Sequence, residues 1–163
     1  MTQIRLATPA DVATILGFVR DLAAFEREPD AVEATEESLT AALFGAHPAA
    51  EAVIAEDEIA ENGEPLGFAI FFHNFSTWTG KRGLYLEDLY VTPAARGRGV
   101  GTALLRHLAR IAVERGCARF EWSVLDWNEP AIRFYRAMGA VGQEEWTVQR
   151  VSGEALARLA DAG

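Results

Sequence analysis

The sequence predicts an α/β fold in which a mixed, mostly antiparallel sheet carries helices on both faces. Short links join three strand-like segments near residues 52–56, 66–72 and 84–91, which favours an antiparallel meander. An amphipathic helix then separates the last of these from a further strand at 120–125, so a crossover should leave those two strands parallel. With 163 residues, half of them hydrophobic, the chain can bury one core, and we expect a single domain over 1–163.

The first elements can be placed in order from local patterns. A short strand is expected at residues 4–6, and a sequence that resembles a capping box begins at Thr8. Apolar residues then recur at helical spacing over 12–23, so one face of this helix should be buried. A second helix should follow a cap at Thr35 and end near Phe44.

The second half of the chain continues the alternation. Apolar residues at helical spacing over 103–112 predict a helix that ends at Gly116, and the next strand is expected at 120–125. Asn128 should cap a helix that has proline in its first turn and runs to Gly139. The segment 143–151 is a candidate final strand.

The composition disfavours some classes of partner. The formal net charge is −9, whereas binding to nucleic acid or to an anionic membrane surface needs a basic face. An acidic protein suits a cationic substrate, and acidity also serves solubility. The sequence contains no long apolar run and no signal-peptide core after a basic start, so we expect a cytoplasmic protein.

Cysteine and histidine are too sparse to predict a metal site. Cys117 is the single cysteine, so it cannot form an internal disulfide, and we expect it to be a small core residue. His47, His73 and His107 form no ligand-spaced pair with each other or with the cysteine. We therefore expect no metal.

The most informative stretch is the strand at 84–91 with the turn Arg96-Gly-Arg-Gly-Val-Gly-Thr102 behind it. Three glycines remove side chains from this turn, so the backbone can approach an anion. The N–H groups and the positive dipole end of the next helix point to the same place, and Arg96 and Arg98 add positive charge. The stretch therefore predicts a pyrophosphate-binding turn.

Two other phosphate-binding patterns do not fit this turn. The dinucleotide fingerprint G-x-G-x-x-G follows its strand directly, whereas the spacing here is G-x-G-x-G and residues 92–95 intervene. The only Gly-Lys pair, Gly80-Lys81, lacks the glycine that a phosphate loop requires. A glycine-rich helix entry without a ligand is the simpler alternative, but the flanking arginines in an acidic protein favour an anion site.

A family resemblance rests on these residues. Arg96-x-x-Gly99-x-Gly101, after a strand that ends in Leu89-Tyr90-Val91, is similar to the acyl-CoA signature of the GNAT acetyltransferases. Tyr85-Leu-Glu-Asp88, Trp78-Thr-Gly80 and Leu125-Asp-Trp-Asn-Glu-Pro130 with Phe134-Tyr135 resemble the spermidine/spermine (diamine) branch and its thialysine-acetylating relative. The resemblance spans nearly the whole chain. It implies a GNAT fold in which the parallel strands splay apart and acyl-CoA lies between them.

The resemblance also implies acetyl-CoA as co-substrate. The backbone at 89–91 is then expected to pair with the pantetheine arm like an added strand and to polarise the thioester carbonyl. The cofactor-binding residues expected on this basis are Leu89, Tyr90, Val91, Arg96, Gly97, Arg98, Gly99, Val100, Gly101, Thr102, Asn128, Glu129, Pro130 and Ala131.

Transfer of an acetyl group to an amine needs a base for the ammonium proton and an acid for the departing thiolate. Strict alternation would send Glu87 and Asp88 to opposite faces of their strand, so one of them should face the cleft. By resemblance, Glu87 accepts the amine proton through a water and Tyr135 is the general acid. The simpler alternatives are a solvated or arginine-paired Glu87 and a core tyrosine.

By resemblance, carboxylates and aromatic rings line the amine channel, and both favour alkylammonium groups. The substrate-binding residues expected are Phe25, Glu26, Trp78, Glu87, Asp88, Glu121, Trp122 and Ser123, with Glu144 or Glu145 nearby. Phe25 in place of a tyrosine, and Ser76-Thr-Trp78 without an acidic residue, are features of the thialysine branch. We expect direct acetylation of a small cationic molecule, either a thialysine- or lysine-like amino acid or a polyamine.

Other functions stay open at this point. A protein lysine or an N-terminus is an alternative acceptor within the same class of enzyme. A non-catalytic acyl-CoA-binding regulatory module, or a plain dimerisation scaffold, would belong to a different class. The resemblance implies a homodimer in which the two subunits complete each other's amine channel.

Overall fold

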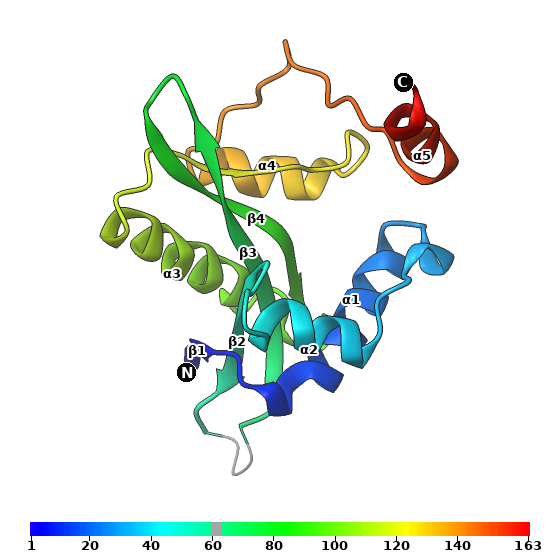
Figure 1. Cartoon of the computed structure of the whole chain (residues 1–163). Coiled ribbons are helices and arrows are strands. Elements are labelled where there is room, and N and C mark those ends of the chain that lie inside the picture. Colours follow the sequence, from blue (N-terminus) through cyan, green and yellow to red (C-terminus); the bar gives the residue numbers. More distant parts are fainter. Residues whose placement is uncertain (60–62) are drawn as a thin grey trace. The chain divides into compact units, whose positions relative to one another are not determined.

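The computed structural model describes residues 1–59 and 63–163, in two units that comprise Met1–Ser123 and Val124–Gly163. The first unit contains a five-stranded sheet (Figure 1). Its strands, in spatial as well as chain order, are β1 (Thr2–Leu6), β2 (Glu51–Asp57), β3 (Pro65–Ser76), β4 (Lys81–Val91) and β5 (Phe120–Trp122). The first four are antiparallel neighbours, and β4 and β5 are parallel, as the crossover predicts.

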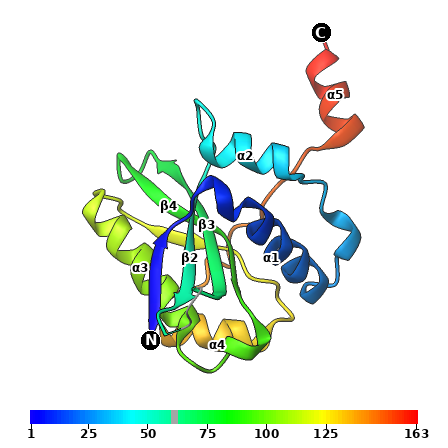
Figure 2. The same ribbon diagram turned by 90° about the horizontal axis from the view of Figure 1, so that it is seen from below.

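Helices cover both faces of this sheet (Figure 2). α1 (Val12–Phe25) and α2 (Glu36–Phe44) pack on one face, where Ile15 and Phe18 meet Ile54, Phe68 and Tyr90 of the strands. α3 (Val100–Glu114) packs on the other face through an apolar stripe that includes fully buried leucines. Because successive side chains of β2 and β3 point to opposite faces of the sheet, these two strands contribute to the core under α1 and α2 and also to the core under α3.

The helix boundaries follow from caps that the sequence shows. The Thr35 hydroxyl oxygen accepts a hydrogen bond from the Ser38 N–H at 3.1 Å, and α2 begins at Glu36, directly after Thr35. Asn128 caps α4 (Glu129–Ala137) of the second unit, with its Oδ1 accepting from the Ala131 N–H at 3.4 Å. Both helices were expected at these positions.

Arg5 on β1 joins the start of α1 to the sheet. Its guanidinium donates to both carboxylate oxygens of Asp11 at 2.8 Å and, through Nε, to Glu56 at 2.7 Å. Asp11 also accepts from the Thr8 N–H at 2.7 Å, which is the backbone half of the expected capping box. These hydrogen bonds, above all the one from Arg5, lower the pKa of the buried Asp11 to about 2.

Two strand predictions are wrong. β5 ends at Trp122, three residues short of the expected 120–125 strand, and no strand forms over 143–151. A strand requires a hydrogen-bonded neighbour, and the structure pairs none with that segment, where Trp146 and Val148 are 70% and 80% exposed. Instead the second unit ends in α5 (Gly153–Asp161), which was not predicted.

The prediction of one domain over 1–163 stays a prediction. Among the described residues, no helix combines the length and the apolar character needed to cross a bilayer.

Candidate active site on β4

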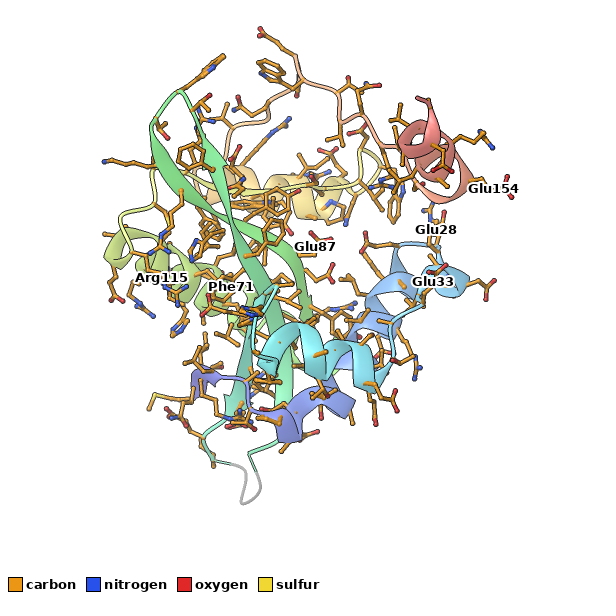
Figure 3. All side chains as sticks on the ribbon, in the orientation of Figure 1. Glu28, Glu33, Phe71, Glu87, Arg115 and Glu154 are labelled. Atoms are coloured by element: carbon orange, nitrogen blue, oxygen red, sulfur yellow. The ribbon has the colours of Figure 1, made fainter. Side chains whose placement is uncertain are left out.

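A β-bulge interrupts β4 at the residue expected to be the base. Ile70 of β3 pairs with Asp88, and the next residue, Phe71, pairs with Leu86, so Glu87 is an extra residue without a partner in the ladder. Figure 3 labels Glu87 on this strand. A bulge of this kind redirects side chains and increases the local twist of the strand.

The bulge corrects the expectation that Glu87 and Asp88 lie on opposite faces. Leu86 shares the α3 face with Phe71, so its neighbour Glu87 is directed to the α1 face. Asp88 pairs with Ile70, which belongs to the core on the α1 side. Both carboxylates are therefore directed to the α1 face, whereas strict alternation would have separated them.

These two carboxylates have a third close to them. Glu26 is the residue that follows α1. The pKa of Asp88 is raised to about 6, first by burial, then by the charge of Glu87 and then by the charge of Glu26. Burial also raises the pKa of Glu26. None of the ion pairs that the structure forms among its described residues involves these three side chains. The cluster therefore favours a bound cation.

One edge of β4 is free for part of its length within the first unit. β5 pairs only with Leu84–Leu86 of β4, so the ladder stops just before the bulge. The Thr92 N–H donates to Leu66 of β3 at 2.9 Å, and alternation then directs the backbone groups of Leu89 and Val91 away from β3. Only these two of the three expected residues, and not Tyr90, present hydrogen-bonding groups to a ligand along that edge.

The glycine turn behind β4 has the geometry that its sequence predicts. Gly97 and Gly99 have φ angles of 76° and 81°, which only glycine adopts without strain, and Gly99 is the N-cap of α3. A Cβ at either glycine would contact nothing within 4 Å, so the turn presents bare backbone. The first N–H groups of α3, at Val100, Gly101 and Thr102, have no partner within the helix. The donor set fits a pyrophosphate.

The two arginines of the turn have different surroundings. Arg96 lies over the rings of Phe25 and Tyr90, with its Cζ 5.5 and 5.8 Å from their centroids, and its Nε donates to the Val91 carbonyl at 3.2 Å. This contact joins the expected cofactor turn to the end of α1. Arg98 instead pairs with Asp57 at the end of β2, at 3.1 Å.

The remaining expected substrate residues of the first unit lie at β5 and at the β3–β4 hairpin. The Tyr85 hydroxyl is 2.8 Å from the Ser123 Oγ, and the Asn74 amide donates to Glu121 at 3.4 Å. Trp78 lies in the turn of the hairpin. Sequence reasoning missed Asn74 and Tyr85 as site residues, although Tyr85 belongs to the quoted motif; the register of β4 and β5 pairs it with Glu121.

The second unit holds the expected general acid and part of the expected cofactor site. Tyr135 lies on α4, half-buried, with its ring 5.5 Å from that of Phe134. Asn128, Glu129, Pro130 and Ala131 form the cap and first turn of the same helix. The expected general acid and these four expected cofactor-binding residues therefore lie on α4 and its N-cap.

The comparisons with known proteins decide the family. The family model described as the acetyltransferase (GNAT) family matches residues 17–140. The chain belongs to the GNAT acetyltransferase family. It is 39% identical to a thialysine N-epsilon-acetyltransferase of Sus scrofa, over 96% of each chain, and 32% identical to an L-ornithine N5-acetyltransferase of Arabidopsis thaliana, over 95% of this chain and 86% of that one.

A solved structure has the same fold. An integron cassette protein from V. cholerae superposes with a TM-score of 0.80 at 28% identity, covering 99% of this chain and 98% of the other. The GNAT resemblance and the predicted mixed sheet with a parallel strand pair are confirmed. The protein is a GNAT N-acetyltransferase.

Proposed function

We propose that this GNAT protein transfers the acetyl group of acetyl-CoA directly to the side-chain amine of a small diamino acid such as thialysine. The carboxylate cluster of Glu26, Glu87 and Asp88, beside the free edge of β4, carries the proposal because it favours an ammonium group. The thialysine and ornithine acetyltransferases that the chain resembles act on amino acids of this kind.

GNAT enzymes generally use acetyl-CoA, and the glycine turn fits it. The left-handed Gly97 and Gly99 and the free N–H groups of α3 would hold the pyrophosphate, with Arg96 adding charge. Leu89 and Val91 would hydrogen-bond the pantetheine arm along the edge of β4. Acetyl-CoA supplies the acetyl group as a thioester, and the family resemblance assigns further polar contacts with it to Asn128.

The acceptor amine is cationic at neutral pH and must lose a proton before it can act as a nucleophile. Asp88 and Glu26 hold the ammonium group, and Glu87 accepts the proton through a water. The nitrogen then bonds to the acetyl carbon as the carbon–sulfur bond breaks, and the family resemblance assigns the proton for the departing sulfur to the Tyr135 hydroxyl. Cys117 takes no part, so no covalent acyl-enzyme forms.

The test is the release of CoA thiol from acetyl-CoA in the presence of thialysine. Glu87→Gln keeps the size of the side chain and removes the base, so kcat/KM should fall by about a hundredfold or more. Glu58→Gln, an equal loss of charge at an exposed position beyond β2, is the matched control and should leave it unchanged. Equal activity of the two variants would exclude Glu87 as the base.

We also propose a cytoplasmic homodimer, by analogy with the family. Light scattering of the purified protein at micromolar concentration should give twice the mass of the 17.8 kDa chain. A mass of one chain at every concentration would exclude the dimer.

A further inference from the structure

A second polar feature of the first unit lies at the other end of β4. A hollow that is open to solvent forms where the β3–β4 hairpin meets the residues that lead into β5. Its lining includes Asn74, Lys81, Arg82, Gly83, Arg119 and Glu121. The hollow therefore combines one carboxylate with several cations.

The hollow and the carboxylate cluster lie on the same face of the sheet. Gly83 pairs with Asn74, and Tyr85 pairs with Phe72 on one side and with Glu121 on the other. Alternation along β3 from Asn74 through Phe72 reaches Ile70, which is the partner of Asp88. The bulge at Glu87 is what brings Asp88 to this face.

The carboxylate of the hollow is held in place. The Asn74 amide donates to Glu121 at 3.4 Å, and both residues line the hollow. Gly83 makes room for this arrangement, because a Cβ there would lie 2.4 Å from the Asn74 Oδ1. A glycine at this point of the strand is thus required by the orientation of Asn74.

Two cations share the face of Glu121. Arg119 precedes Glu121 by two residues and Lys81 precedes Gly83 by two, so alternation directs both to that face. Arg82 has the opposite parity, and its guanidinium donates to the Arg115 carbonyl at 3.5 Å. Glu121 complements the α-ammonium group of an amino acid, and Lys81 and Arg119 complement its α-carboxylate. A polycation would instead meet two like charges, those of Lys81 and Arg119.

The separation of the two features fits a diamino acid. Tyr85, the partner of Glu121, pairs with Phe72 of β3, and Asp88 pairs with Ile70 two residues along β3, so the two positions are about 7 Å apart along the strands. The five bonds from the α-carbon of a lysine-like chain to its terminal nitrogen span about 6 Å when extended.

We propose that the hollow binds the α-ammonium and α-carboxylate groups of the acceptor, through Glu121 and through Lys81 with Arg119 respectively, while the side-chain amine reaches Glu87 and Asp88. The proposal rests on the proposed function and deepens it. It makes the acceptor a free amino acid rather than a polyamine. Lys81, Arg119 and Glu121 are then the residues that select for a free amino acid.

The experiment uses two acceptors that differ only in the carboxylate: thialysine and its decarboxylated diamine. The wild type should have the higher kcat/KM with thialysine. In the double variant Lys81→Gln/Arg119→Gln, the ratio of kcat/KM for thialysine to that for the diamine should fall about tenfold or more, mainly through the KM for thialysine. Arg106→Gln, at an exposed position on α3, is the control and should keep the wild-type ratio.

Glu121→Gln gives a second, independent test. Both acceptors carry the second ammonium group, so this variant should raise the KM for each by a similar factor. A thermal shift with acetyl-CoA equal to that of the wild type shows that each variant is folded.

Three results would overturn the subsite. One is a wild type that acts equally well on the diamine, and another is a double variant that keeps the wild-type ratio. The third is a Glu121→Gln variant that leaves both KM values unchanged. These outcomes differ from the failure of the proposed function, which would show as no CoA release by the wild type with any amine.

Discussion

Substitution of Asp88 by asparagine should stabilise the protein at neutral and alkaline pH. Burial and the charges of Glu87 and Glu26 raise the pKa of Asp88 from its ordinary 3.8 to about 6 in the folded state. The folded protein therefore binds this proton more tightly than the unfolded chain does. Stability is lost as the pH rises from about 4 to about 6, and the whole loss is present above pH 6.

The size of this effect follows from the two pKa values. The difference between 3.8 and about 6 corresponds to about 3 kcal/mol, which Asp88→Asn should recover at pH 8 and mostly not at pH 4. For a chain of this length, 3 kcal/mol corresponds to a rise in Tm of roughly 6–12 °C. The same variant should acetylate amines more slowly, because the cluster has lost a carboxylate.

The assay is urea denaturation of both proteins between pH 4 and pH 8. Asp21→Asn, an exposed aspartate on α1, serves as the control and should change stability little at any pH. The reasoning is refuted if Asp88→Asn stabilises the protein no more at pH 8 than at pH 4. A carboxyl titration of Asp88 near 4, measured by NMR, would refute it as well.

Three further predictions concern Arg5, Gly99 and Tyr135, the last of them by the family resemblance. Arg5→Ala leaves the buried Asp11 carboxylate without its main partner, and it should cost about 2 kcal/mol of unfolding free energy at pH 7. Because the pKa of Asp11 is lowered to about 2, the stabilisation by the Arg5–Asp11 interaction is present above pH 4 and is lost as the pH falls towards 2. An Arg5→Ala variant that unfolds in urea at pH 7 like the wild type would contradict this prediction. Gly99→Ala should weaken acetyl-CoA binding, measured by titration, because φ of 81° strains an alanine by about 1–2 kcal/mol and shifts the start of α3, whereas Gly80→Ala, at φ of 64° in the hairpin, should leave binding intact. Tyr135→Phe should lower kcat by about a hundredfold while the Kd for acetyl-CoA is unchanged, and full activity would remove the assigned acid role.

Much of the fold could be predicted from local patterns, namely apolar residues at helical spacing, helix caps and a glycine turn. The spacing of apolar residues in 12–23 and 103–112 located α1 and α3, and the caps at Thr35 and Asn128 fixed where two helices start. The glycine turn was readable because left-handed φ angles at Gly97 and Gly99 require glycine. Each of these features depends on neighbours within a few residues.

The errors arise where tertiary pairing decides. A one-residue bulge at Glu87 depends on how β3 meets β4, so period-two reasoning placed Glu87 and Asp88 on opposite faces. The segment 143–151 was a candidate strand, but a strand needs a hydrogen-bonded partner, and the structure pairs none with it. The pKa of Asp88 is raised by its burial and by the charges of Glu87 and Glu26, and Glu26 lies more than sixty positions earlier in the chain.

The missed final helix did have a local signal. Ser152 precedes α5 as its N-cap residue, and five of the nine residues of the helix are alanine or leucine, which favour helices. Asn74, by contrast, gave no sequence signal as a site residue. Its role follows only from its contact with Glu121 across the sheet.

The product of the wild-type reaction shows whether the enzyme acetylates the side-chain amine of a diamino acid. Purified protein is mixed with acetyl-CoA and thialysine, CoA thiol is titrated, and the product is analysed by mass spectrometry and NMR. We expect one side-chain N-acetylthialysine for each CoA released, at a rate well above that of the Glu87→Gln variant. CoA release without an N-acetylated amino acid, or acetylation confined to polyamines, would contradict the proposed function.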